Sequence, residues 1–167
     1  MKKLLPAAAF FGAAAACLVR AWRTYPLLPE RVASHFAFSG APDGWMSKRA
    51  FAGLQVGVVL LMGAALSAAA SRLSRRGDAR LNLPHKEYWL APERRAQTMA
   101  WFRDFFLWFG AGTYAALFDL FRQTDRVNLG LSPVLEHPKA TLALYVAWAA
   151  ALVYAVNRRF RRVPPAA

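Results

Sequence analysis

Residues 51–71 read FAGLQVGVVLLMGAALSAAAS, an apolar run that contains no Asp, Glu, Lys or Arg. At a rise of about 1.5 Å per residue, an α-helix of this length is about 30 Å long, which matches the hydrocarbon core of a bilayer. A run of this length without charge is typical of a helix surrounded by lipid. We therefore predict that this stretch crosses a membrane.

Three further apolar runs of similar length flank this stretch. They are Leu4–Trp22, Phe102–Phe121 and the slightly shorter Ala140–Val156. Segments rich in proline, glycine and charge separate the four runs, at residues 23–49, 72–101 and 122–139. The pattern predicts an all-α fold: an integral membrane four-helix bundle that forms one domain over residues 1–167.

The charge of the chain is strongly basic, with 22 Lys and Arg against 9 Asp and Glu, while 57% of its residues are apolar and its mean hydropathy is +0.21. In a soluble protein such an excess would suggest nucleic acid as a partner. Here the basic residues lie between apolar runs, where they indicate topology by the positive-inside rule. We predict no nucleic-acid partner.

The basic residues gather at both termini and in the middle loop. They are Lys2, Lys3, Arg72, Arg75, Arg76, Arg80, Lys86, Arg94, Arg95, Arg158, Arg159, Arg161 and Arg162. The other two loops carry fewer basic residues. They also contain acidic residues, which are Glu30, Asp43, Asp125 and Glu136. We therefore predict that both termini and the 72–101 loop are cytoplasmic, in a multi-pass protein of the bacterial cytoplasmic (inner) membrane.

The N-terminal run has a second interpretation, as a cleaved signal peptide, because Lys2 and Lys3 precede an apolar stretch. We favour a retained helix, since the apolar run continues past Cys17; cleavage would leave three spans. Cys17 is the single cysteine and cannot form an intrachain disulfide, and no Cys and His spacing resembles a zinc site. No metal or cofactor is predicted.

The first outer loop, residues 23–49, holds the candidate binding residues Glu30, His35, Asp43 and Trp45. The Pro42-Asp43-Gly44 sequence predicts a turn, and Ser47 is placed to cap the second span. Trp45 suits the headgroup layer of a membrane. Histidine is the residue here that could bind a metal or exchange protons near neutral pH; the alternative is a structural hydrogen bond that orders the loop.

Two motifs carry a resemblance to a known family. The outer loop contains LPERVASHFAFSGAPDGWMSK, residues 28–48, and the middle loop contains NLPHKEYWLAPERR, residues 82–95. The first resembles the signature of an uncharacterised bacterial membrane domain, a DUF family, that forms the N-terminal part of SdpI-like toxin immunity proteins. The second resembles a segment that recurs after the second span in single-domain members of that family. The resemblance implies a single-domain member with an unnamed role, and immunity or signalling as the related activity.

The middle loop, residues 72–101, is predicted to be the cytoplasmic working surface. Its candidate residues are Arg75, Arg76, Tyr88, Trp89, Arg94 and Arg95. The arginines that follow the second span would attract anionic lipids of the bilayer. Tyr88 and Trp89 are expected to insert at the headgroup layer or in a cleft between helix ends, and Pro92 is expected to begin a helix that runs into the third span.

Charges inside the predicted spans are rare. We expect Asp119 to pair with Arg122 one turn away or with a residue of the first outer loop, and Arg20 to extend its side chain toward the headgroups. No ionisable residue lies at the middle of a span, which argues against a proton-coupled transporter or an ion channel.

Three functions remain open. The favoured one is a binding, sensing or immunity-related module that recognises an envelope peptide or protein through the outer loop. The others are an interfacial membrane enzyme or metal-binding protein that uses His35, and an accessory subunit of a transporter. No catalytic motif supports an enzyme.

Overall fold

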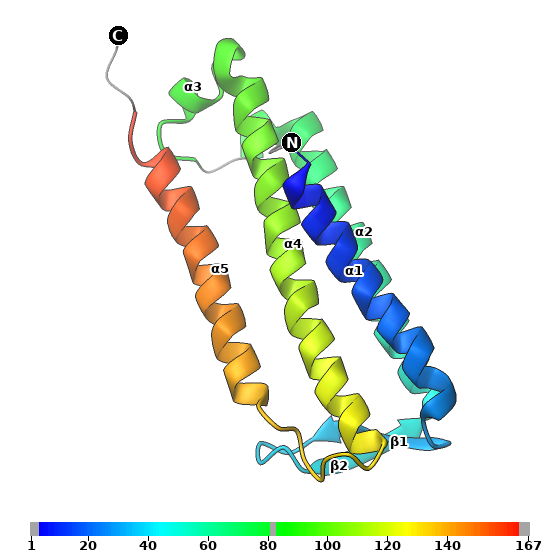
Figure 1. The fold of residues 1–167 in the computed structure, drawn as a ribbon. Helices are drawn as coiled ribbons and strands as arrows, with labels where there is room; N and C mark the ends of the chain where they lie inside the picture. The colour runs from blue at the N-terminus through cyan, green and yellow to red at the C-terminus, as the bar shows by residue number, and fades with distance from the viewer. Residues whose placement is uncertain (1–3, 81–82, 164–167) are drawn as a thin grey trace.

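Four long helices dominate the computed structural model, which describes residues 4–80 and 83–163, without the side chains of residues 73–80. The helices are α1 (Leu5–Thr24), α2 (Lys48–Arg80), α4 (Pro92–Asn128) and α5 (Pro138–Phe160). The shorter elements are η1 (Tyr25–Leu27), β1 (Arg31–Phe36), β2 (Pro42–Ser47) and α3 (Lys86–Trp89). The long helices pack together (Figure 1), so the predicted helical bundle is confirmed.

The two ends of the bundle differ. The start of α1, the end of α5 and α3 lie at one end, and the β1–β2 hairpin lies at the other (Figure 1). We call these the terminal end and the hairpin end. The predicted outer loop and the predicted cytoplasmic loop therefore lie at opposite ends of the bundle.

Helix α4 is the centre of the bundle and contacts α1, α2 and α5. Tyr114 of α4, 1% exposed, donates a hydrogen bond through its hydroxyl to the carbonyl of Val59 in α2 at 2.7 Å. Cys17 of α1 is equally buried and lies 3.4 Å from the Tyr114 carbonyl oxygen through its Sγ. Gly110 of α4 leaves room for the ring of Phe10, which a Cβ at that position would overlap. Close approach of helix backbones at small residues is typical of packing in membranes.

Among the described residues, three helical segments are long and apolar enough to cross a membrane: Leu5–Leu27, Lys48–Arg72 and Pro138–Phe160. They place the chain in contact with a lipid bilayer as a multi-pass membrane protein. The fourth predicted span, residues 102–121, lies within α4 but is not among these segments. Arg103, Asp104 and Asp119 lower its hydropathy. Arg103 and Asp104 pair with each other at exposed positions, whereas Asp119 has a partner on α5, Thr141.

The hairpin corrects one prediction. Pro42, Asp43 and Gly44 do not form a turn but begin β2, which pairs antiparallel with β1. The chain reverses instead at residues 37–41, where Gly40 adopts a φ of +87° and donates to the Ala37 carbonyl at 2.8 Å. Proline is tolerated at the first residue of a strand, so Pro42 is compatible with β2. The predicted cap of α2 is confirmed: Ser47 Oγ accepts from the Ala50 N–H at 3.2 Å.

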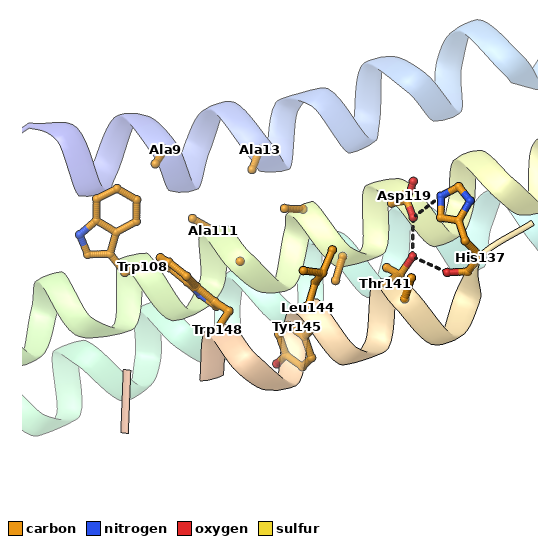
Figure 2. Close-up of a pocket in the computed structure, with 14 residues that line it drawn as sticks. Ala9, Ala13, Trp108, Ala111, Asp119, His137, Thr141, Leu144, Tyr145 and Trp148 are labelled. Carbon is orange, nitrogen blue, oxygen red and sulfur yellow. Dashed lines mark hydrogen bonds and ion pairs between the residues drawn. The ribbon is translucent and has the colours of Figure 1, made fainter. Parts of the chain in front are cut away.

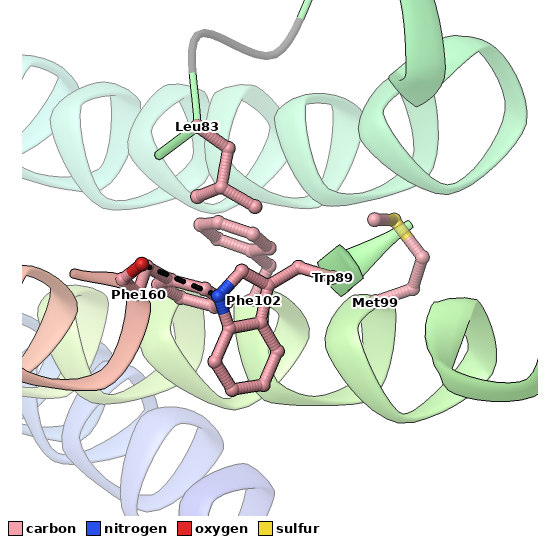
Figure 3. Close-up of a cluster of buried hydrophobic side chains, with 5 residues drawn as sticks. All are labelled: Leu83, Trp89, Met99, Phe102 and Phe160. Carbon is pink, nitrogen blue, oxygen red and sulfur yellow. Dashed lines mark hydrogen bonds between the residues drawn. The ribbon is translucent and has the colours of Figure 1, made fainter. Parts of the chain in front are cut away.

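The middle segment contains more helix than predicted. α2 continues to Arg80, and α4 begins at Pro92, which confirms the predicted helix start. At the terminal end the side chains of Leu83, Trp89, Met99, Phe102 and Phe160 form a buried cluster (Figure 3). The cluster joins the segment before α4 to the last turn of α5. Asn82 lies outside the described residues.

Candidate functional site

The hairpin is fixed to the helix ends by Asn128, the last residue of α4. Asn128 Oδ1 accepts from the Ala33 N–H at 2.6 Å, and its Nδ2 donates to the Ala33 carbonyl at 3.0 Å. The amide group thus pairs with β1 as a neighbouring strand would. Ala33 is 4% exposed, so the two bonds satisfy backbone groups that water cannot reach. Sequence analysis missed this residue, because asparagine at a helix end has no mark that identifies a distant partner.

Two further contacts hold the hairpin in place. The Leu135 N–H, from the α4–α5 connection, donates to the Gly40 carbonyl at 2.9 Å. Lys48 Nζ lies 2.9 Å from Glu30 Oε1, and its hydrogen bond holds the pKa of Glu30 below the ordinary value for glutamate. Beneath the hairpin, Leu28, Val32 and Phe51 form a small buried cluster. The predicted binding residue Glu30 is therefore engaged with the start of α2.

The outward face of the hairpin brings three predicted residues together. His35 Nδ1 lies 2.5 Å from Asp43 Oδ1, across the two strands, with the two side chains 76% and 44% exposed. Trp45 follows two positions later in β2, pairs with Ala33 and is also exposed. Gly44 makes this arrangement possible, since a Cβ there would lie 2.9 Å from the Cβ of His35. Phe38 at the hairpin tip is 88% exposed, and Lys139 Nζ lies 4.1 Å from its ring centroid.

This face offers both hydrogen-bonding groups and apolar rings. An exposed imidazole and carboxylate can accept and donate hydrogen bonds to a ligand, and Phe38 and Trp45 offer apolar ring surface. Within the described part of the chain, no three His, Cys, Asp or Glu side chains lie close enough to hold a metal ion. His35 has Asp43 as its side-chain partner there, which orders the loop.

Arg20 differs from its prediction. Its side chain does not extend toward the headgroups but turns into the bundle, where its guanidinium forms an ion pair with Asp125 of α4. Its Nη2 also donates to Gln55 Oε1 of α2 at 2.8 Å. Burial without a partner would be costly for either charge, and pairing the two charges across two helices offsets part of that cost. The ion pair and the hydrogen bond to Gln55 together join α1, α4 and α2 near the hairpin end.

A groove lies between α1, α4 and α5, with a volume of about 650 Å³. Small side chains of α1 and α4 line part of it, including Ala9, Ala13 and Ala111 (Figure 2) and also Ala115. Trp108 and Trp148 lie toward one end of the groove, and Asp119, His137 and Thr141 lie toward the other (Figure 2). Sequence analysis did not identify this groove, because it requires three helices that are distant in sequence.

Polar contacts close the hairpin end of the groove. Arg122 Nη2 donates to Asp119 Oδ1 at 2.8 Å, which confirms the predicted pair. Gln123 and Thr141 donate to Asp119 Oδ2 at 2.7 and 2.5 Å. His137 Nε2 lies 3.5 Å from the same oxygen and 3.4 Å from Arg122 Nη2. Asp119 thus ties α4 to the start of α5.

The predicted cytoplasmic residues lie at the terminal end. Trp89 is 8% exposed and its Nε1 donates to the Phe160 carbonyl at 3.2 Å, so it occupies a cleft between helix ends. The Arg94 guanidinium lies 4.0 Å from the centroid of the Tyr88 ring, and Arg95 is half-buried. Side chains of Arg75 and Arg76 lie outside the described part of the structure.

A comparison with protein families gives one match. The profile of DUF1648, described as a domain of unknown function, matches residues 12–62. These residues include most of α1, the hairpin and residues 48–62 of α2. The match carries no link to SdpI-like proteins. No curated protein and no solved structure matches the chain. The chain is a multi-pass membrane protein that contains a DUF1648 domain at residues 12–62.

Proposed function

We propose that this protein is a binding and sensing module of the bacterial cytoplasmic membrane that recognises an envelope peptide through the outward face of its hairpin. The observation that carries the proposal is the fixed hairpin with exposed His35, Asp43 and Trp45. In this proposal the hairpin end faces outward and both termini lie in the cytoplasm, as the distribution of Lys and Arg indicates.

The rigidity of the hairpin supports this role. An isolated two-stranded hairpin is at best marginally stable in water, and this one is held by Asn128, by the Gly40–Leu135 bond and by the Lys48–Glu30 pair. A surface that is already ordered loses less conformational entropy when it binds a ligand. Such support is expected for a recognition surface and is unnecessary for a passive linker.

The composition of the face indicates the ligand class. Exposed aromatic rings beside hydrogen-bonding groups are typical of peptide and protein recognition, since aromatic residues dominate the energetics of interfaces. A relation of residues 28–48 to SdpI-like toxin immunity proteins, which is part of this proposal and not of the family match, would favour an envelope peptide, with immunity or sensing as its consequence. In sensing, Trp89 and Arg94 at the terminal end would present the state of the bundle to a cytoplasmic partner.

Site-specific photocrosslinking in living cells tests the proposal. A photoreactive amino acid placed at Trp45 should yield a discrete adduct with an envelope peptide, and His35→Ala should weaken that adduct. The matched control is Leu61 of α2, which is 72% exposed on the helix surface and should crosslink to lipid. Adducts from position 45 that are no more specific than those from position 61 would contradict the proposed function.

A further inference from the structure

The groove between α1, α4 and α5 has the size and position of a lipid site. Its volume of about 650 Å³ falls within the range of about 300–1,000 Å³ that small-molecule sites span. It runs beside α1 and α5, two of the segments that can cross the membrane. The bilayer therefore supplies a candidate occupant at high local concentration.

The walls favour an unbranched apolar chain. Ala13, Ala111 and Ala115 leave a smooth surface between the helices, and Leu144 covers part of the α5 side. Along the groove, a polar contact joins α5 to α4 between Tyr145 Oη and Thr113 Oγ1 at 3.2 Å. Protein interiors are close-packed, so a groove of this size in the membrane is expected to hold an acyl chain.

The hairpin end of the groove favours a negative charge. Arg122 balances the negative charge of Asp119. The second carboxylate oxygen of Asp119 already accepts hydrogen bonds from Gln123 and Thr141. His137 and Lys139 add basic groups at the start of α5. The N-terminus of this 23-residue helix adds the positive end of its dipole, and its N-cap residue makes no side-chain capping bond.

From the groove and its basic mouth together, we propose that the protein binds one anionic phospholipid, with an acyl chain along the alanine wall and its phosphate near Arg122, His137 and Lys139. The second acyl chain stays in the bilayer. Lys139 also lies over the ring of Phe38 at the hairpin tip, but the residues that line the groove come from the helices and the start of α5 and not from β1 or β2. The proposal does not rest on the proposed function. A lipid here would fill the space between α4 and α5 at the level where the α4–α5 connection contacts the hairpin.

Native mass spectrometry tests this proposal on the full chain. The protein is reconstituted in nanodiscs with equal amounts of phosphatidylglycerol and phosphatidylcholine and transferred to mild detergent. We expect one retained phosphatidylglycerol. Ala115→Trp, at an exposed alanine of the groove wall, should abolish retention. Ala147→Trp, at an exposed alanine of α5 that does not line the groove, should leave it unchanged.

The headgroup is tested separately. Lys139→Gln at an exposed position should lower retention about fivefold, since one cation near an anionic lipid contributes about 1 kcal/mol. Folding of each variant is verified by protection of Cys17, and Ala140→Trp replaces Ala115→Trp if the latter does not fold. Equal retention of the two lipids, or full retention by a folded Ala115→Trp variant, overturns the proposal.

Discussion

The buried ion pair between Arg20 and Asp125 offers the sharpest test of the structure. Their side chains are 10% and 7% exposed. Asp125→Ala would leave the Arg20 guanidinium with the Gln55 amide oxygen at 2.8 Å and the Phe121 ring at 5.2 Å to its centroid. Neither neighbour carries a negative charge. Removing one partner of a buried pair costs about 3–5 kcal/mol, and we expect the free energy of unfolding to fall by that amount.

The exposed pair Arg103–Asp104 provides a matched control. Its side chains are 53% and 36% exposed, and its closest contact is 2.7 Å. Exposed pairs contribute about 0–1 kcal/mol, so Asp104→Ala should change the free energy of unfolding by less than about 1 kcal/mol. The same substitution at two positions on α4 thus separates burial from charge.

The single cysteine of the chain supplies the assay. Cys17 is 1% exposed and packs against Tyr114, so a thiol-reactive fluorescent dye labels it only when the bundle opens. Titration with a denaturing detergent then gives the free energy of unfolding for each variant. Arg20→Met/Asp125→Leu should recover most of the lost stability, because apolar replacement of both charges is often neutral. A loss at Asp125 no larger than at Asp104, or a double variant as unstable as Asp125→Ala, would refute the reasoning.

Three further predictions concern other parts of the molecule. Asn128→Ala leaves the Ala33 N–H and carbonyl without partners, which costs about 1–3 kcal/mol of stability, so amide hydrogen exchange in β1 should accelerate. The control Asn157→Ala, at an exposed position, should leave that exchange rate unchanged. Trp89→Ala should lower the free energy of unfolding by about 3–5 kcal/mol in the Cys17 assay, whereas Trp22→Ala, at a residue 79% exposed, should have little effect. A reporter fused after α5 should be active in the cytoplasm, and a reporter inserted in the hairpin should be active outside the membrane. An external signal from the C-terminal fusion would contradict the proposed topology.

Features with a local cause were predictable from the sequence. The apolar runs identify three membrane-crossing segments because length and composition alone determine them. Pro92 marks the start of α4 because proline fits the first turn of a helix, and Ser47 caps α2 through a bond to a residue three positions away. Asp119 and Arg122 meet because residues three positions apart lie on the same face of an α-helix.

Features with a distant cause were not predictable in this way. Asn128 and Ala33 are 95 residues apart, and nothing near either residue indicates the other. Arg20 was expected to extend toward the headgroups because its partner on α4 was unknown. The prediction of a turn at Pro42-Asp43-Gly44 was wrong for a different reason. Gly44 provides space beside His35, whereas Gly40 provides the positive φ that the chain reversal requires.

Helix α4 is the least apolar of the long helices, and its polar residues connect it to the other elements. Asp119 reaches α5, Asp125 reaches α1, and Asn128 reaches β1. Polar groups in a membrane helix are tolerated where neighbouring elements provide partners, and a central helix has neighbours on most of its surface. Two of the polar residues that lower the hydropathy of α4, Asn128 and Asp119, therefore fix the hairpin and the mouth of the groove, respectively. A ligand that shifts the hairpin would act on α4 through Asn128. Asp119, at the mouth of the groove, lies on the same helix within three turns of Asn128.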